Sequence, residues 1–438
     1  MKPNILYIHS HDTGRYIEPY GYSVPTPNLK KLAKEGVLFR KAFSAAPTCS
    51  PSRASFLTGQ YPHNNGQYGL VNRGFELPDT DKHIVNVLKE EGYKSTLIGM
   101  QHIRKEPSTI GYDNVLEVED NYSKYVTPSA IDFINNNIDK PFFLSVGYEE
   151  THRPFHEIKD EEGIKYTNPP SPLPDTPRTR KDMAAFKESA AVLDNGIGKI
   201  LNTLKENGLY QNTIIIFTTD HGLPFPEMKC TLKDDGIGVS LIIRGPHGFT
   251  GGRVIDSMVS HIDIYPTLCQ LIDIKIPDWV QGKSVLPLIK DETKSIHGQI
   301  YAEVNYHTAY EPKRAVRTKR WKYIRRLRNR TKPLLSNTDQ SLSKDVLLEN
   351  DWGEQYIRNE ELYDLMLDPN ESNNLVNEGS HKDILEEMRN NLDKWMIKTD
   401  DPLKKGELPQ FDNALINRDS DKSADDIWNY VDKQDGYY

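Results

Sequence analysis

Cysteine is scarce in this 438-residue chain, which has only Cys49, Cys230 and Cys269. Three widely separated cysteines predict no disulfide framework, and their spacing excludes a cysteine-based zinc site. Long apolar runs are also lacking, since none approaches the length of a membrane span. The opening residues, MKPNILYIHSHD, have no charged start followed by the longer apolar core of a signal peptide. We therefore expect a cytoplasmic protein with no membrane partner.

An excess of positive charge is lacking as well, because 63 acidic residues outnumber 55 basic ones and the formal net charge is −8. Nucleic acids and anionic membranes require a basic surface, so we expect no nucleic-acid partner. An anionic substrate would need cations gathered locally in its site. The length indicates one large α/β domain with a smaller companion, or two to three domains.

Short apolar strands alternate with helical patterns over roughly the first 300 residues. Strands are expected at Asn4–Ile8, at Val37–Phe39, before Gly99, in FFLSVG, in TIIIFTT and in GVSLIIRGP. Helices are expected at Asn28–Glu35, in HIVNVLKEE, from Met183 to Leu209 and in SHIDIYPTLCQLI. This alternation predicts a mixed, mostly parallel sheet flanked by helices.

The pattern changes after about Ile300, where short strands are followed by a closing amphipathic helix in HKDILEEMRNNLDKWMIKT. We predict an α/β catalytic domain over residues 1–300 and a smaller α+β domain over residues 301–438. Residues 335–355 form a polar insertion without a clear period. The acidic tail from Asp400 is expected to be a wrapping arm or partly disordered.

Polar residues follow several of the expected strands directly. His11-Asp12, His102, His152 and Asp220-His221 each come just after one of them. Ligands of parallel sheets bind beyond the carboxyl ends of the strands. The sequence therefore predicts that these side chains share one site.

Cys49 lies in an unusual setting for a structural cysteine. In APTCSPSRASFLTG it is surrounded by hydroxyls and a guanidinium, at the start of a predicted short helix. Buried structural cysteines behave as small apolar residues, so a polar setting indicates a chemical role. The helix N-terminus and Arg53 would both stabilise a negative charge there.

The run Cys49-Ser50-Pro51-Ser52-Arg53, followed by Thr58-Gly59, resembles the Cys-x-Pro-x-Arg…Thr-Gly motif of the sulfatase family, in the alkaline-phosphatase-like superfamily. The resemblance continues in order through GYKSTLIGMQH, FTTDHG and SHIDIYPTLCQLIDIKIPD, and it covers nearly the whole chain. APTCSPSRASFLTG, DHGLPFP and LDKWMIKTDDP look closest to the heparan N-sulfatase (sulfamidase) branch. The resemblance implies an alkaline-phosphatase-like fold. It also implies a sulfohydrolase acting on a small sulfated saccharide, either an O-sulfate ester or N-sulfoglucosamine.

The same resemblance implies that Cys49 is converted to formylglycine by a maturation enzyme. The hydrated aldehyde carries two hydroxyls on one carbon. One can attack sulfur, and the other can expel the sulfate by re-forming the aldehyde.

The family also holds one divalent cation between two acidic residues after the first strand and an Asp-Asn or Asp-His pair after a later one. Asp12, Asp220 and His221 match that pattern, whereas His11 stands where most of the family has an acid. His11 is then a ligand, a supporting residue or a substrate contact. Calcium is implied by the resemblance, while imidazole suits Mn²⁺ or Zn²⁺ better, and Mg²⁺ is a further alternative.

The remaining roles also come from the resemblance. His152 matches the residue that protonates the leaving group, and His102 the residue that deprotonates the diol. Lys229 matches a cation that grips sulfate, and His307 is either a substrate contact or structural. Met100 replaces the usual lysine of Gly-Lys-x-His, so either Arg104 or Lys105 takes its place or the site works with one cation fewer.

Two other functions stay open at this point. Phosphonate monoester and phosphodiester hydrolases of the same superfamily share the motif around Cys49 and an Asp-His metal pair. An inactive homologue that binds sulfated glycans would account for Met100 and His11.

Overall fold

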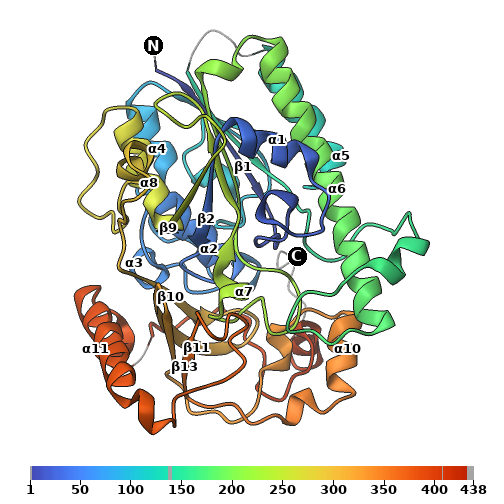
Figure 1. Cartoon of the computed structure of the whole chain (residues 1–438). Helices are drawn as coiled ribbons and strands as arrows, with labels where there is room; N and C mark the ends of the chain where they lie inside the picture. The colour runs from blue at the N-terminus through green and yellow to red at the C-terminus, as the bar shows by residue number, and fades with distance from the viewer. Residues whose placement is uncertain (1, 137–140, 407, 432–438) are drawn as a thin grey trace.

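The computed structural model describes residues 2–136, 141–406 and 408–431. Figure 1 shows two sheets, the larger above the smaller, with helices around them. Within the described residues the larger sheet consists of β1 (Asn4–Ser10), β2 (Val37–Phe43), β3 (Lys94–Gly99), β4 (Asn114–Leu116), β5 (Phe142–Gly147), β6 (Thr213–Thr219), β7 (Gly238–Val239), β8 (Leu241–Arg244) and β9 (Arg253–Ser260).

The larger sheet is mixed and mostly parallel, as predicted. Its order is β4-β3-β5-β1-β6-β8-β2-β7, and β9 pairs with β2. β1 runs parallel to β5 and β6, and β3 to β4 and β5, whereas β8 is antiparallel to both β6 and β2. The expected strand GVSLIIRGP is interrupted at Ser240, whose backbone N–H donates to Gly14 O at 2.8 Å. β9 was not expected from the sequence.

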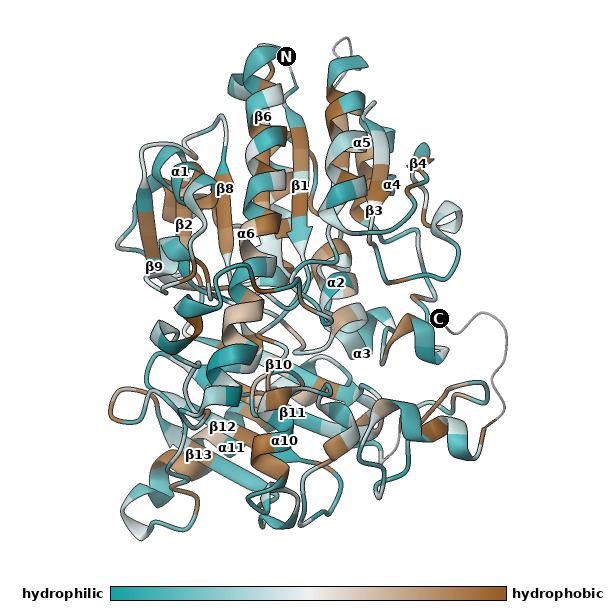
Figure 2. Cartoon of the chain, turned by 90° about the vertical axis from the view of Figure 1, so that its right-hand side faces the viewer, coloured by the Kyte–Doolittle hydropathy of each residue, from teal (hydrophilic) through white to brown (hydrophobic). Residues whose placement is uncertain are grey.

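Helices cover both faces of this sheet because neighbouring strand residues point to opposite sides. Ile5 and Tyr7 of β1 pack with apolar residues of α2 (Cys49–Thr58), α4 (Ile84–Glu90) and α8 (Ile264–Leu271). Leu6 and Ile8 pack with α1 (Pro27–Glu35), α5 (Ser123–Asn136) and α6 (Pro177–Glu206). Figure 2 shows the resulting apolar strands between amphipathic helices. Shorter helices are α3 (Pro62–Asn65), α7 (Asp234–Ile237) and α9 (Leu286–Lys290).

The longest helix, α6, begins at Pro177 rather than at Met183. Thr176 and Thr179 form a capping box, and a proline in the first turn is already set for helical geometry. These capping signals precede the apolar periodicity on which the sequence prediction depended. No helix in the described ranges is both long and apolar enough to cross a bilayer.

The smaller sheet is antiparallel, with the order β10 (Gln299–Tyr306), β11 (Tyr310–Thr318), β12 (Trp321–Arg326) and β13 (Glu360–Asp364). The closing helix α11 (Lys382–Lys398) covers one face, as Figure 1 shows. The other face packs against Phe43, Leu232, Ile237 and Met258 from the larger unit. The predicted division at residue 300 stays a prediction. The insertion at 335–355 contains a short helix, α10 (Leu342–Leu348).

Candidate active site

Two neighbouring parallel strands deliver the core of the site. Ser10 of β1 lies opposite Thr219 of β6, so the residues that follow each strand emerge side by side. The backbone N–H of Asp12 donates to Asp220 Oδ1 at 2.8 Å, which ties the two strand ends together. Asp12 has a φ of 58°, a left-handed conformation that aspartate tolerates better than most residues.

Two carboxylates and two imidazoles converge at these strand ends. His11 Nδ1 lies 2.8 Å from Asp12 Oδ1 and 3.2 Å from Asp220 Oδ2. His221 Nε2 lies 3.1 Å from Asp12 Oδ1. All four side chains are buried, and their ligand atoms and Cys49 Sγ lie within 4.8 Å of one another. This donor set of oxygen and nitrogen atoms fits a divalent cation.

The charges within this cluster stabilise one another. Burial alone would raise the pKa of Asp220, but His221, His11 and Arg53 lower it to about 2. Burial would likewise lower the pKa of His221, whereas the two aspartates raise it to about 9. The site is therefore built to keep both carboxylates ionised.

Cys49 begins helix α2 and is only 2% exposed. Its Sγ lies 3.4 Å from His221 Nε2. Although burial disfavours a thiolate, the charges of Lys229, His11 and His221 and a hydrogen bond from His102 hold the pKa of Cys49 well below its usual value. Position 49 thus combines a helix N-terminus with surrounding positive charge, which suits a reactive oxyanion.

The side chain of Arg53 is buried next to position 49 and does not line an open pocket. Its Nη2 lies 3.0 Å from Asp220 Oδ2, and its Nη1 lies 2.5 Å from His9 Nδ1. Burial, and then the charge of Arg53, hold the pKa of His9 well below its usual value, so His9 accepts as a neutral imidazole. The sequence analysis did not single out His9, because it lies inside an apolar strand.

Three further histidines surround position 49. His152 Nδ1 donates to Arg153 O at 2.6 Å, which leaves Nε2 facing the cluster, 3.8 Å from Asp12 Oδ2. The rings of His152 and His11 are 4.4 Å apart between centroids. His102 and His307 both lie close enough to the Cys49 thiol to favour its charged form, and the ring centroid of His102 is 6.1 Å from that of His11. The structure therefore brings every residue of the predicted site to one place.

The side chain of Met100 leaves no cation at that position, and neither suggested substitute contacts the site. Arg104 instead donates to Leu77 O at 3.1 Å and pairs with Glu76 at 3.2 Å. Lys105 is exposed and forms no hydrogen bond or ion pair with the described residues. Among the described residues, the site therefore has one cation fewer than the family pattern.

Lys229 is 4% exposed and connects the cluster to the polar insertion. Its Nζ lies 2.9 Å from Asp12 Oδ2 and 3.0 Å from Asp339 Oδ2. Despite burial, Lys229 and His152 lower the pKa of Asp339. The sequence analysis missed Asp339 because nothing in the aperiodic insertion signals its position in space.

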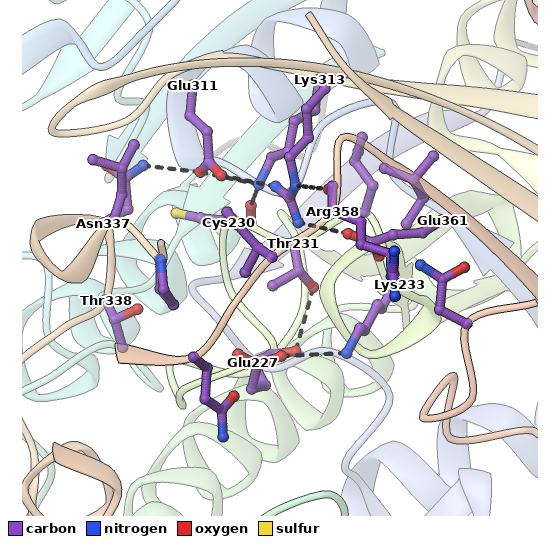
Figure 3. A pocket seen from close by; sticks show the side chains of 18 of the residues that line it. Glu227, Cys230, Thr231, Lys233, Glu311, Lys313, Asn337, Thr338, Arg358 and Glu361 are labelled. Atoms are coloured by element: carbon purple, nitrogen blue, oxygen red, sulfur yellow. Dashed lines mark hydrogen bonds and ion pairs between the residues drawn. The ribbon is translucent and has the colours of Figure 1, made fainter. Parts of the chain in front are cut away.

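A polar cavity of about 320 Å³ lies next to Lys229, and Figure 3 shows its lining. Lys313 Nζ donates to Cys230 O at 2.9 Å and lies 3.0 Å from Glu311 Oε2. Asn337 Nδ2 donates to the same carboxylate at 3.2 Å. Because these contacts hold both the Lys229–Cys230 segment and the insertion, the cavity wall fixes the position of Lys229.

Comparison with known proteins agrees with this geometry. The family model described as "Sulfatase" matches residues 3–274, and the model "N-sulphoglucosamine sulphohydrolase, C-terminal" matches residues 227–340. The chain is 29% identical to human N-sulphoglucosamine sulphohydrolase, over 91% of both chains. It is 28% identical to an ulvan-active sulfatase of Formosa agariphila, over 95% of this chain and 78% of the relative.

Solved structures show the same fold. One, in complex with its substrate D-glucosamine-2-N,6-O-disulfate, superposes with a TM-score of 0.74 at 20% identity, over 93% of this chain and all of that chain. A 2-O GAG sulfatase superposes with a TM-score of 0.73 at 22% identity, over 93% of this chain and 95% of that chain. Since the sulfatase model alone spans more than half of the sequence, this chain belongs to the sulfatase family.

Proposed function

We propose that this chain is a sulfohydrolase that releases sulfate from a small sulfated saccharide, using a formylglycine made from Cys49. The observation that carries the proposal is the convergence of three histidines, two of them half-buried, with the buried Cys49, Lys229 and carboxylate–imidazole cluster. A formylglycine hydrate supplies two hydroxyls on one carbon, one to attack sulfur and one to release sulfate afterwards. A maturation enzyme of the host would be the required partner.

The proton movements follow from the positions of two histidines. His152 holds a proton on Nδ1 through its bond to Arg153 O, and its half-buried ring faces Asp12 and the outside. Because Nδ1 keeps its proton, the ring must be doubly protonated to act as the acid: Nε2 then gives its proton to the leaving oxygen or nitrogen of the sugar as the bond to sulfur breaks, which leaves His152 neutral. His102 lies beside position 49 and is placed to take the proton of the second hydroxyl.

The cationic groups would hold the sulfate. Lys229 lies between Asp12 and the mouth of the site, and His307 contacts position 49 from the smaller sheet. Both are placed to donate to sulfate oxygens in a site that excludes water. Arg53 orients Asp220 and supports the helix start.

Asp12, Asp220, His221 and His11 would hold one divalent cation, which supplies positive charge that favours an ionised nucleophile and binds sulfate oxygens. The sequence resemblance implies calcium, which prefers oxygen ligands. Two imidazoles in the donor set favour Mn²⁺ or Zn²⁺ instead. We therefore propose a transition metal at this centre.

The decisive experiment pairs mass spectrometry with turnover. The peptide containing position 49, from protein made in its own host, should carry an aldehyde in place of the thiol. The same preparation should hydrolyse 4-nitrophenyl sulfate and sulfated glucosamines, and Cys49→Ala should lower turnover at least about 1,000-fold, because the nucleophile is lost. A dominant rate on phenyl phosphonate would favour the phosphonate hydrolase alternative. A converted, metal-loaded protein without any turnover would favour a glycan-binding role.

A further inference from the structure

Asp339 lies at the exposed edge of an otherwise buried site. Its side chain is 21% exposed and that of His152 is 28% exposed, whereas those of Asp12 and Lys229 are almost fully buried. The nearest ligand atoms of Asp339, His152 and Asp12 lie within 4.8 Å of one another. A sugar attached to a sulfate beside Lys229 would therefore pass Asp339 and His152.

The segment that carries Asp339 is held on its inner side by the smaller sheet. Asn337 Oδ1 accepts hydrogen bonds from Thr308 N at 3.1 Å and from Ala309 N at 2.9 Å. These residues directly follow His307. Lys344 Nζ donates to Thr338 O at 2.7 Å, which fixes the peptide immediately before Asp339.

The same insertion is also held from the opposite side, near His152. Asp182 of α6 accepts a hydrogen bond from Ser343 Oγ at 2.6 Å. The same carboxylate binds the guanidinium of Arg153 at 2.6 and 2.8 Å. Asp339 is therefore presented by a preorganised segment fixed to both walls of the site, as precise recognition requires.

Among the described residues, only one oxygen of Asp339 is engaged. Oδ2 accepts the hydrogen bond from Lys229, whereas Oδ1 accepts no hydrogen bond from this part of the chain. A carboxylate oxygen beside the leaving-group acid can accept a charge-assisted hydrogen bond, which is about twice as strong as a neutral one. It also repels a second anion, and specificity arises from both the attraction and the repulsion.

We propose that Asp339 is a specificity-determining residue that binds a hydroxyl or amino group of the sugar next to the sulfated position and disfavours sugars with a second anionic group there. This inference rests on the proposed sulfohydrolase function of the same site. It assigns to the polar insertion the selection of the sugar, whereas the strand ends carry the chemistry.

The test compares wild type and Asp339→Asn on three sulfates. These are 4-nitrophenyl sulfate, the faster of N-sulfated and 6-O-sulfated glucosamine, and glucosamine carrying both sulfates. Asp339→Asn should lower kcat/KM on the monosulfated sugar about 10- to 100-fold, mainly through KM, because a charge-assisted bond is lost. Its rate on 4-nitrophenyl sulfate should change less than about threefold. The ratio of kcat/KM on the disulfated sugar to kcat/KM on the monosulfated sugar should be higher for Asp339→Asn than for wild type.

Asp345→Asn provides a matched control, because Asp345 lies in the same insertion and its side chain makes no hydrogen bond to the described residues. It should leave all three rates unchanged. An equal loss by Asp339→Asn on all three sulfates would assign Asp339 to supporting Lys229 and overturn the inference, as would no change on any of them. Wild-type protein with confirmed formylglycine but no activity on any sulfate would overturn the proposed function as well.

Discussion

His11 is the residue that distinguishes the donor set of the proposed metal site. Its Nδ1 and the Nε2 of His221 lie 2.8 to 3.8 Å from the facing oxygens of Asp12 and Asp220. Adjacent ligand atoms are about 3.3 Å apart around a tetrahedral transition-metal ion and about 3.4 Å apart around a six-coordinate calcium ion, so this spacing fits either ion. Our proposal of a transition metal therefore rests on the two nitrogen donors, because calcium prefers oxygen ligands.

Replacing His11 by aspartate should change the ion that the protein retains. After dialysis against equal Ca²⁺, Mn²⁺ and Zn²⁺, wild type should hold about one Mn²⁺ or Zn²⁺ per chain, and His11→Asp should shift toward Ca²⁺, because an oxygen ligand replaces a nitrogen. Elemental analysis measures this directly, and the thermal stabilisation by each ion should follow the same order. The exposed His247→Asp is the control. Wild type that retains calcium would contradict the assignment.

His83 gives a pH dependence that is independent of the active site. It caps α4 by accepting the N–H of Val85 on Nδ1 at 3.1 Å, and burial lowers its pKa to about 3. Because the unfolded chain takes up this proton near pH 6.5 and the folded chain only near pH 3, stability is lost as the pH falls between these values. His83 should contribute a loss of about 2 kcal/mol between pH 7 and pH 5. Urea unfolding of His83→Asn should show a shallower slope in this range, and an identical slope would rule out this role.

At the scale of elements, the sequence predicts which polar residues follow the strands and share one site. It does not predict which buried polar residues pack around the strands. His11, Asp12, Asp220 and His221 follow apolar runs, and parallel pairing forces such ends together. His261 packs against β6, where its Nε2 lies 3.0 Å from Thr218 Oγ1. Nothing in the neighbouring sequence distinguishes it from any other buried histidine. A polar role of this kind depends on tertiary contacts.

Local sequence patterns were also insufficient to predict α10 in the insertion, strand β9 of the larger sheet and the first turn of α6. α10 is too short for a periodicity to emerge from polar residues, and Asp339 acquires its position only through contacts with β11 and α6. Strand β9 mixes exposed and buried residues along RVIDSMVS, so it lacks the uniform apolar run of the central strands. Capping signals, by contrast, would have given the correct start of α6.

Glu303 joins strand β10 of the smaller sheet to helix α3. It lies on β10, fully buried, and accepts from the backbone N–H of His63 in α3 at 3.0 Å and from Asn305 Nδ2 at 2.9 Å. Its Oε2 also contacts His63 Nδ1. Although burial opposes ionisation, His63 and Arg314 lower the pKa of Glu303 to about 2.

Glu303→Gln should therefore destabilise the fold in a pH-dependent way. Near neutral pH the loss should be about 3 kcal/mol, since a buried charge pair loses one partner. The greater free energy of unfolding of the wild type is fully present above pH 4.5. It should disappear as the pH falls toward 2, because the pKa of Glu303 is lower in the folded than in the unfolded chain. Urea titrations at several pH values measure both effects, with the exposed Glu387→Gln as control. An unchanged unfolding midpoint at pH 7 would contradict this role.

At the scale of the whole molecule, the described tail, residues 408–431, returns from the smaller sheet to the active-site loops. Phe411 packs on Phe75 with ring centroids 4.9 Å apart and on Tyr68 at 5.4 Å. The backbone N–H of Leu415 donates to Arg73 O, and that of Asn417 to Thr308 O. The tail is thus a wrapping arm that connects the loop after α3 with the turn that carries His307.

Removing the ring of Phe411 should weaken both stability and catalysis, because one arm supports two loops. For a partly buried aromatic we expect Phe411→Ala to cost about 2 kcal/mol, less than the 3–5 kcal/mol of a fully buried one. kcat/KM should fall several-fold as the turn at His307 loosens, and amide exchange should accelerate at residues 306–309. Phe411→Leu, which keeps apolar contact, should retain most of both properties. If Phe411→Ala loses stability while exchange at 306–309 and kcat/KM stay at wild-type levels, the arm stabilises the fold without positioning His307.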